Sequence, residues 1–391
     1  MNKILNLVIS QRPESDYTTG DPIRETQLPT VKQYTEEDYP NDFFLYVIKL
    51  GDKHCNANYG GAFDINAGIL NSAPNKILKR ARKSSAKILI SWPMESFLRP
   101  DIFHLMHDYF EYHNIPLENV IYLTCCPNGK KLYEEFCRNV NMLPLMTMEY
   151  IPWYLYGSTE FTSQEYTAGN RSKLFLSMNR RMHLHRTMLF KHIVDSNLLE
   201  KTFISFPLMH PDSGETFSTR VTRDYPHVID IETANRLEKL LPLKLDISDW
   251  KPYPLPIKSD SLDYFYNNSL FSIVCETYFF SKIIHLTEKT FKPIINRHPF
   301  IMVASAHTLK AIKDFGFKTF DSVIDESYDS IENDSDRFKK IIEILEEISQ
   351  WSNEKQIEVS KQIKEIVDYN YTVLKFRPRE ELNKFINNYG I

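Results

Sequence analysis

The sequence has few glycines and cysteines, and it contains no hydrophobic run long enough to span a membrane. Only 11 glycines are spread over 391 residues, which is unlike a repeat array or a flexible linker, and 13% aromatic residues exclude a disordered chain. The five cysteines are odd in number and scattered, with no CxxC pair and no histidine at zinc spacing. This usage fits a protein of the reducing cytoplasm.

The N-terminal segment MNKILNLVIS is too short to cross a bilayer, and no cleavage site of small residues follows it. We therefore expect neither a signal peptide nor a membrane span. The chain has 47 Lys and Arg against 51 Asp and Glu, a formal net charge of -4, so nucleic-acid binding would need a local basic face. The length predicts two domains of roughly 150 to 200 residues, each large enough to bury its own core.

Short apolar runs alternate with amphipathic helical stretches in the first half of the chain, after an extended opening that reaches about Asn41. Strands are predicted over 43–50, 86–92 and 120–125, helices over 101–114 and 130–140, and a further apolar run over 142–148. This order is typical of a parallel sheet with crossover helices, and thus of a Rossmann-like unit.

A second series of the same kind follows a polar, irregular stretch at 150–171. Strands are predicted over 173–177, 202–206, 271–275 and 299–304, helices over 183–199 and 307–315, and a Pro-rich excursion without a clear period over 207–256. The predicted fold class is α/β, with one Rossmann-like domain over 1–165 and a second over 166–335. A charged helical segment, 336–391, follows. Its apolar stripe over 341–348 is expected to pack across a domain; a coiled-coil partner is the alternative, although the heptad fails after Ser352.

Ligands of doubly wound folds bind beyond the carboxyl ends of the strands, so the residues after the strand FLS form the first candidate site. This strand-to-helix turn holds the densest basic cluster: Asn179, Arg180, Arg181, His183, His185 and Arg186. Free backbone N–H groups, the positive end of the helix dipole and arginine together make an anion site for a diphosphate or a carboxylate. A solvated helix start with surface arginines is the alternative. Neither a GxGxxG nor a GxxxxGK[ST] fingerprint is present.

The second candidate site is Val274-Cys-Glu-Thr277 followed by His285-Leu-Thr-Glu-Lys-Thr-Phe-Lys292. Thr287 is a candidate N-cap, with Glu288 and Lys289 in the first helical turn. A lysine there opposes the helix dipole, which an anion bound beside it would offset, and a neighbouring carboxylate can accept hydrogen bonds from ribose hydroxyls. Taken alone, such a helix start is more often structural than functional.

The segment SIVCETYFFSKIIHLTEKTFKPIINRHPFIMVA resembles the C-terminal nucleotide-sugar domain of fucosyltransferase-type glycosyltransferases, in which a Glu-containing strand end precedes a TEK helix start and a further strand. The chain is also similar to a set of phage-encoded proteins through FLSMNRRMHLHR, TEKTFKPI, GFKTF and DESYD, which cover roughly Lys173 to Asp329. The likeness of the N-terminal half rests on ENVIYLT and on the alternation of strands and helices alone.

The resemblance implies a GT-B glycosyltransferase: two Rossmann-like domains facing each other across a cleft, the donor held by the C-terminal domain, the acceptor by the N-terminal one, and an inverting transfer. It implies that Glu288 contacts the donor ribose, Lys289 the diphosphate, and Glu276 the donor sugar or ribose. His285 stands where the family usually has Tyr, and PFIMVAS replaces a strand that ends in Gly, so the donor is left open as a UDP or GDP sugar. The sugar nucleotide is a co-substrate, and we expect no permanently bound cofactor and no metal.

The chemistry of the transfer indicates further residues. Cations at the leaving diphosphate stabilise the transition state, and Lys289, Arg180 and Arg186 are the candidates. The acceptor proton needs a base. Glu95, just after the strand ILISW, and Asp64, in the turn YGGAFDIN, are the candidates, although each can equally be structural. Asp101 is a helix N-cap first, and the DxD-like string Asp334-Ser-Asp336 is interpreted as a solvated turn.

The likeness to phage-encoded proteins favours viral double-stranded DNA with a hydroxymethylated base, such as hydroxymethylcytosine, as the acceptor, with a glycan or a protein as the runner-up. DNA phosphates would need cations, and a basic run between Lys76 and Lys87 offers Lys79, Arg80, Arg82 and Lys83; a charged amphipathic helix is the alternative. An extruded base would face Trp92, Tyr59 or Phe97. A non-catalytic nucleic-acid or nucleotide-binding module is the second class of function, but it gains nothing from carboxylates beside its lysines. No GxSxG or HExxH string supports a hydrolase.

Overall fold

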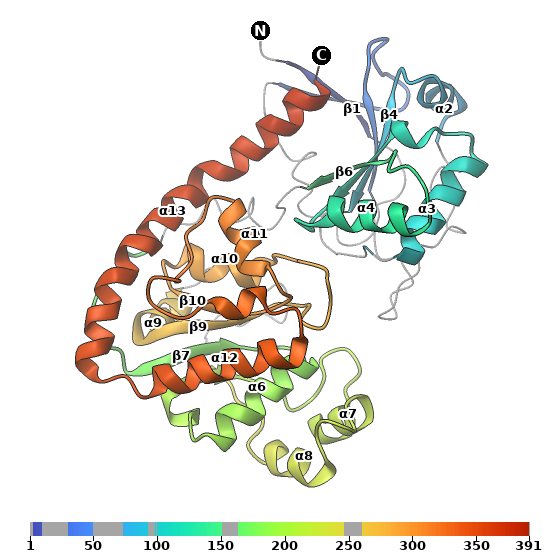
Figure 1. The fold of residues 1–391 in the computed structure, drawn as a ribbon. Coiled ribbons are helices and arrows are strands. Elements are labelled where there is room, and N and C mark those ends of the chain that lie inside the picture. Colours follow the sequence, from blue (N-terminus) through green and yellow to red (C-terminus); the bar gives the residue numbers. More distant parts are fainter. Residues whose placement is uncertain are drawn as a thin grey trace. The chain divides into compact units, whose positions relative to one another are not determined.

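The computed structural model describes residues 3–9, 30–49, 73–92, 98, 100–150, 163–245 and 260–390. The chain divides into two compact units. Unit 1 consists of Met1–Gly157 with Phe376–Ile391, and unit 2 of Ser158–Lys375. Each unit is built on a parallel sheet with crossover helices (Figure 1), which confirms the predicted α/β class.

Unit 1 contains a six-stranded sheet in the order β2-β1-β3-β4-β5-β6, in which every neighbouring pair is parallel. Its strands are β1 (Leu5–Ile9), β2 (Val31–Tyr34), β3 (Leu45–Lys49), β4 (Lys87–Trp92), β5 (Val120–Thr124) and β6 (Thr147–Tyr150), and its helices are α2 (Asn75–Arg82), α3 (Pro100–Tyr112) and α4 (Gly129–Asn139). All five residues of β5 are buried, as expected for a parallel strand that is covered on both faces.

Unit 2 contains a four-stranded parallel sheet in the order β10-β9-β7-β8. Its strands are β7 (Lys173–Met178), β8 (Thr202–Ser205), β9 (Ser269–Cys275) and β10 (Phe300–Val303). Its helices are α6 (Leu184–Asp195), α7 (Phe217–Asp224), α8 (Ile231–Glu238), α9 (Asp260–Asn268), α10 (Glu288–Ile295), α11 (Thr308–Asp314) and α12 (Asp334–Ser349). The apolar runs predicted as the four strands are confirmed. The two central strands carry the core: Phe271 of β9, for example, lies edge-on to Phe320 and Trp351.

The C-terminal helical segment consists of two helices, α12 and α13 (Asn353–Tyr389), which are separated by a short non-helical stretch. The predicted apolar stripe of α12 is confirmed, since Ile341, Ile344, Leu345 and Ile348 are buried. Helix α13 contributes to both units (Figure 1): the part that ends at Lys375 belongs to unit 2, and the part that begins at Phe376 belongs to unit 1. In unit 1, Leu382, Phe385 and Ile386 join the core formed by strands β1, β3, β4 and β5.

Two segments contain helices or strands that the sequence patterns did not predict. The opening to Asn41, predicted to be extended, contributes the parallel strands β1 and β2, whose pairing was not predicted. Strand β2 reads VKQY and has two exposed polar residues at its centre, so it lacks the apolar alternation by which a strand is detected. The excursion over 207–256 contains the helices α7 and α8, and Asp230 caps α8 by accepting a hydrogen bond from Thr233 N at 2.8 Å.

Candidate functional site

The candidate site lies at the carboxyl ends of β7 and β9, which are neighbours in the sheet of unit 2. From β7 the chain passes through α6 to β8 on one side, and from β9 it passes through α10 to β10 on the other. This divergence makes a topological switch point, the place where open α/β sheets bind their ligands. The two predicted clusters, after β7 and after β9, therefore meet at one edge of the sheet.

The start of α10 is fixed by the carboxylate of Glu276, which is 1% exposed. One oxygen, Oε1, accepts hydrogen bonds from Thr287 N at 2.9 Å and Thr290 Oγ1 at 2.6 Å. The other, Oε2, accepts from Thr287 Oγ1 at 2.7 Å and Thr277 N at 3.2 Å. Four donors of the protein thus occupy the carboxylate that the resemblance assigns to the donor sugar or ribose. The contacts of Glu276 are those of a residue that positions the helix start.

Thr287 is the N-cap of α10, as predicted, and its hydroxyl accepts a hydrogen bond from Lys289 N at 3.2 Å. The same hydroxyl oxygen lies 3.0 Å from Lys289 Nζ. The ammonium is also 3.5 Å from Glu288 Oε1 and 3.8 Å from Glu276 Oε2. Thr287 therefore contacts both the Glu276 carboxylate and the Lys289 ammonium, and so links the position of Lys289 to that of Glu276.

Glu288 and Lys289 are both about one-quarter exposed, at 25% and 27%. Burial alone would raise the pKa of Glu288, but the ammonium groups of Lys289 and Lys292 and hydrogen bonds at the helix start lower it to about 2. Glu288 is therefore ionised at neutral pH. The first turn of α10 offers a carboxylate that can accept hydrogen bonds from hydroxyls and, next to it, a cation that can bind phosphate oxygens.

Helix α6 begins beside this turn. Its N-cap residue is His183, whose side chain makes no capping hydrogen bond. Arg186 Nη2 donates to the carbonyls of Cys275 at 3.1 Å and Glu276 at 3.2 Å, and His185 Nε2 lies 2.9 Å from the Glu276 carbonyl oxygen. These contacts tie the start of α6 to the end of β9. The amides of the first helical turn have no partner within the helix, so they are a binding element for an anion.

Both histidines at the start of α6 are neutral at physiological pH. Burial, reinforced by the positive charge of Arg186, lowers the pKa of His183 to about 2 and that of His185 to about 3. His285, predicted as a donor contact, is 4% exposed in the loop before α10, and burial lowers its pKa to about 4. The positive charge of the site therefore comes from its lysines and arginines.

The remaining residues of the basic cluster link the site to the rest of unit 2. Asn179 is 5% exposed; its N donates to the Ser205 carbonyl of β8 at 3.1 Å and its Nδ2 to Ser177 Oγ at 2.9 Å. Arg180 is half-buried in the turn. Arg181 pairs with Asp212 at 3.2 Å. Asn179 thus joins the ends of β7 and β8, and Arg181 joins the turn to the excursion.

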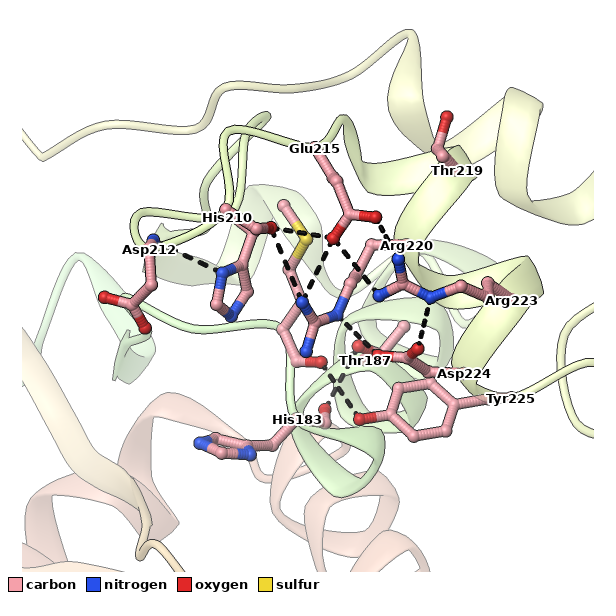
Figure 2. Close-up of polar contacts among 12 residues, drawn as sticks. His183, Thr187, His210, Asp212, Glu215, Thr219, Arg220, Arg223, Asp224 and Tyr225 are labelled. Carbon is pink, nitrogen blue, oxygen red and sulfur yellow. Dashed lines mark hydrogen bonds and ion pairs between the residues drawn. The ribbon is translucent and has the colours of Figure 1, made fainter. Parts of the chain in front are cut away.

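Figure 2 shows how the excursion supports the turn before α6. Glu215 accepts a hydrogen bond from Arg220 at 3.1 Å and also pairs with Arg223, and Asp224 pairs with both arginines, at 2.5 and 2.8 Å. At the end of this network, Tyr225 donates from its hydroxyl to the Met182 carbonyl at 3.4 Å, directly before His183. The polar residues of α7 were not assigned a role from the sequence. They support the turn before α6, which forms one side of the candidate site.

The DESYD segment of the resemblance has a supporting role. Glu326 accepts hydrogen bonds from Phe320 N at 2.7 Å and from the Thr319 hydroxyl, and burial raises the pKa of Glu326 to about 7. Asp329 accepts from Leu309 N and Lys310 N at the start of α11, at 2.8 and 2.9 Å. Sequence reasoning assigned no role to these carboxylates.

Arg337 of α12 was also missed. The residue is 1% exposed, and its side chain donates to the carbonyls of Phe279 at 2.8 Å, Ala304 at 3.1 Å and Ile331 at 2.8 Å. Its guanidinium lies 4.4 Å from the centre of the Phe279 ring. Arg337 thereby joins the loops that follow β9 and β10. A signal was present, because Arg337 precedes Ile341 by four residues and so falls on the apolar stripe of its helix.

Helix α2, which carries the basic run, leads into the amino end of β4. The end of α2 therefore lies near the amino end of that strand and away from its carboxyl end. Arg80 donates to the carbonyls of Pro40 at 2.8 Å and Asp42 at 2.6 Å and lies 4.7 Å from the centre of the Phe44 ring, and Arg82 donates to the His113 carbonyl at 3.2 Å. These two arginines hold loops of unit 1. Lys79 and Lys83 are exposed.

The two candidate bases, Asp64 and Glu95, lie outside the described residues, as do Tyr59 and Phe97. Trp92 ends strand β4. Within the described residues, no group of three or more His, Cys, Asp and Glu is arranged to hold a metal ion. No helix in the same ranges is both long enough and apolar enough to cross a membrane.

No protein-family model and no curated protein matches the chain. Among solved structures it is similar to phage T4 β-glucosyltransferase, with 12% identity over 99% of this chain and 100% of that chain and a TM-score of 0.40. It is similar to a UDP-forming α,α-trehalose-phosphate synthase from Burkholderia xenovorans, with 9% identity over 90% and 75% of the two chains and a TM-score of 0.46. The N-terminal domain of Candida albicans trehalose-6-phosphate phosphatase matches with 11% identity over 100% and 97% and a TM-score of 0.46. These likenesses are too distant to assign an activity.

Proposed function

We propose that this protein is a nucleotide-sugar-dependent glycosyltransferase that binds its donor at the carboxyl ends of β7 and β9. One observation carries the proposal: the ionised Glu288 and the ammonium of Lys289 stand side by side, partly exposed, at the switch point of a parallel sheet. A carboxylate suits ribose hydroxyls, and a cation next to it suits a diphosphate. A site for phosphate alone would have no use for the carboxylate.

The proposed chemistry follows from the charges of the site. When the bond between the anomeric carbon and the phosphate oxygen breaks, its electron pair stays on the nucleoside diphosphate. Lys289, Arg180 and the amides of the first turn of α6 would stabilise this charge. Arg186 donates to backbone carbonyls, so its contribution is to hold α6 against the end of β9.

The acceptor hydroxyl attacks the anomeric carbon from the opposite face and gives its proton to a carboxylate, for which we propose Glu95 or Asp64. We propose a hydroxymethylated base, such as hydroxymethylcytosine in double-stranded DNA, as the acceptor. Support comes from the motif resemblance to phage-encoded proteins, which spans both parts of the donor site. A glycan or a protein acceptor would use the same donor chemistry.

The first test is a thermal-shift screen of the whole protein against UDP, GDP, CMP and their sugar conjugates. A ligand at 100 times its Kd stabilises the native state by about 2.7 kcal/mol, roughly 5–10 °C in Tm for a unit of this size. Lys289→Ala should weaken nucleotide binding roughly 10- to 100-fold. Lys355→Ala, at an exposed position of α13, is the matched control and should bind normally. A folded sample that responds to no nucleoside diphosphate would overturn the proposal.

The acceptor is tested by the release of nucleoside diphosphate from the donor identified in the screen. Duplexes with hydroxymethylcytosine and with cytosine at the same positions are compared. Release that requires the hydroxymethyl group supports the DNA acceptor. Donor binding without any dependence on DNA would direct the search to glycans and proteins.

A further inference from the structure

Lys292 of α10 is a buried lysine that no motif assignment includes. It is 4% exposed, although it follows the partly exposed Lys289 by only three residues on the same helix. Within the described residues its ammonium makes no hydrogen bond and has no carboxylate within 4 Å. A buried cation without a partner is expensive, so its presence calls for an anion.

Few charged groups act on this ammonium. From its own helix, the carboxylate of Glu288 attracts it and the ammonium of Lys289 repels it. From the end of β9, Glu276 is turned toward Thr287 and Thr290. From the loop before α10, His285 is neutral above pH 7, since burial lowers its pKa to about 4. Among the described residues, the one carboxylate that attracts Lys292 is therefore that of Glu288, which lies 3.5 Å from the ammonium of Lys289 and is shared with it.

Lys292 lies one turn into the helix whose start carries Glu288 and Lys289, and both residues act on it electrostatically. Side chains three and four positions apart share one face of a helix. We propose that Lys292 is a second cation of the donor site and binds the phosphate oxygens of the nucleotide together with Lys289. This inference rests on the proposed donor site and adds a residue that the motif does not contain.

The number of protons taken up when the nucleotide binds tests the inference. Burial, with repulsion from Lys289, lowers the pKa of free Lys292 to about 8 even though Glu288 raises it. A bound phosphate raises the pKa again, so binding at pH 8.5 takes up a proton, on the order of half a proton or more per nucleotide. The nucleotide itself does not take up this proton, because the last pKa of its phosphates is near 6 and they stay ionised at pH 8.5. Between pH 7 and pH 9 the affinity should fall by about tenfold.

The experiment is calorimetric titration of the full chain with the nucleoside diphosphate found in the screen, at pH 8.5, in two buffers of different ionisation enthalpy. Lys292→Arg keeps its charge at this pH and should bind without proton uptake. Lys292→Met should lose both the uptake and at least tenfold in affinity at pH 7. Lys289→Ala should bind more weakly and keep part of the uptake, because the pKa of Lys292 rises when the repulsion from Lys289 is removed but burial still lowers it. Lys355→Ala should keep both affinity and uptake.

The outcomes separate the inference from the proposed function. Nucleotide binding by the native protein without proton uptake, and with Lys292→Met as tight as the native protein, would overturn the role of Lys292 and leave the donor site standing. No nucleotide binding by the native protein would overturn both. The proton uptake of the native protein and the behaviour of Lys292→Arg decide the question even if Lys292→Met fails to fold.

Discussion

Replacing Glu276 by glutamine (Glu276→Gln) changes a single atom of the carboxylate that anchors the start of α10. The remaining carbonyl oxygen can still accept hydrogen bonds from Thr287 N and Thr290 Oγ1. The new amide nitrogen is a donor, so it cannot accept from Thr277 N or from the Thr287 hydroxyl as Oε2 does. The substitution therefore keeps the shape of the side chain and removes half of its hydrogen bonds.

The size of the effect follows from these contacts. A hydrogen bond to a charged group contributes about 1.5–3 kcal/mol, and a buried donor left unsatisfied costs about 1–3 kcal/mol. The Thr287 hydroxyl can rotate to accept from the new amide, so the loss is smaller than two complete bonds. We expect the free energy of unfolding of unit 2 to fall by about 2–4 kcal/mol, which lowers its Tm by roughly 4–16 °C.

Scanning calorimetry measures this stability, and nucleotide titration separates positioning from direct contact. If Glu276 acts by placing Lys289, then Glu276→Gln weakens binding of the nucleoside diphosphate and of its sugar conjugate by the same factor. The loss should also disappear in a Lys289→Ala background, where there is no ammonium left to place. Thr290→Val is the matched control, since it removes one bond to the same carboxylate at 2.6 Å and leaves Thr287 intact.

Two results would refute the reasoning. An unchanged Tm would mean that the two hydrogen bonds lost from Oε2, those donated by Thr277 N and the Thr287 hydroxyl, contribute nothing measurable. A loss confined to the sugar conjugate would place the Glu276 carboxylate on the sugar, as the family resemblance implies.

Three further predictions concern residues around the site. Arg337→Met should lower the free energy of unfolding by about 3–5 kcal/mol, because it leaves buried carbonyls without donors, and urea denaturation should show a lower midpoint; a midpoint equal to that of the native protein would contradict this. Glu326 has a folded pKa of about 7, above its ordinary 4.5, so the native state holds more protons than the unfolded state between these values, and its stability falls as pH rises through that window, by roughly 3 kcal/mol. Glu326→Gln should remove this part of the slope, measured as the difference in unfolding free energy between pH 5 and pH 8. Asp64→Asn or Glu95→Gln, whichever removes the base, should stop transfer while nucleotide binding in the thermal-shift assay is unchanged; if both variants retain full transfer, the base lies elsewhere.

The central strands, and the strand ends that carry the candidate site, could be predicted from the sequence. Parallel strands covered on both faces, such as β5, β7 and β9, consist mostly of apolar residues, and the polar residues that follow neighbouring strands such as β7 and β9 lie at one edge of the sheet. Strand β2 was missed because an edge strand with exposed polar residues lacks this signal. Helices α7 and α8 were missed because each has only eight residues within a polar stretch.

The direction in which a side chain points could not be predicted from the sequence. Glu276 and Glu288 are the same residue type in the same motif, yet one is enclosed by four donors and the other is partly exposed. The basic run of α2 shows the same limit. Composition suggested a surface for phosphates, but the carbonyls of Pro40 and Asp42 happen to lie within reach of Arg80. Such contacts depend on segments that are distant in sequence, and only the folded chain brings them together.

The division of α13 between the two units determines the order in which they can be completed during synthesis. Unit 1 begins first, but Leu382, Phe385 and Ile386 are part of its core, and they follow all of unit 2 in the chain. Until these three residues have been synthesised, the apolar side chains of β1, β3, β4 and β5 that pack against them remain uncovered on that side. Unit 2, whose residues form one continuous stretch, can fold as soon as its own C-terminal residues emerge. The unit that is begun first is therefore finished last, and a nascent chain stalled before Phe376 would expose this surface to chaperones.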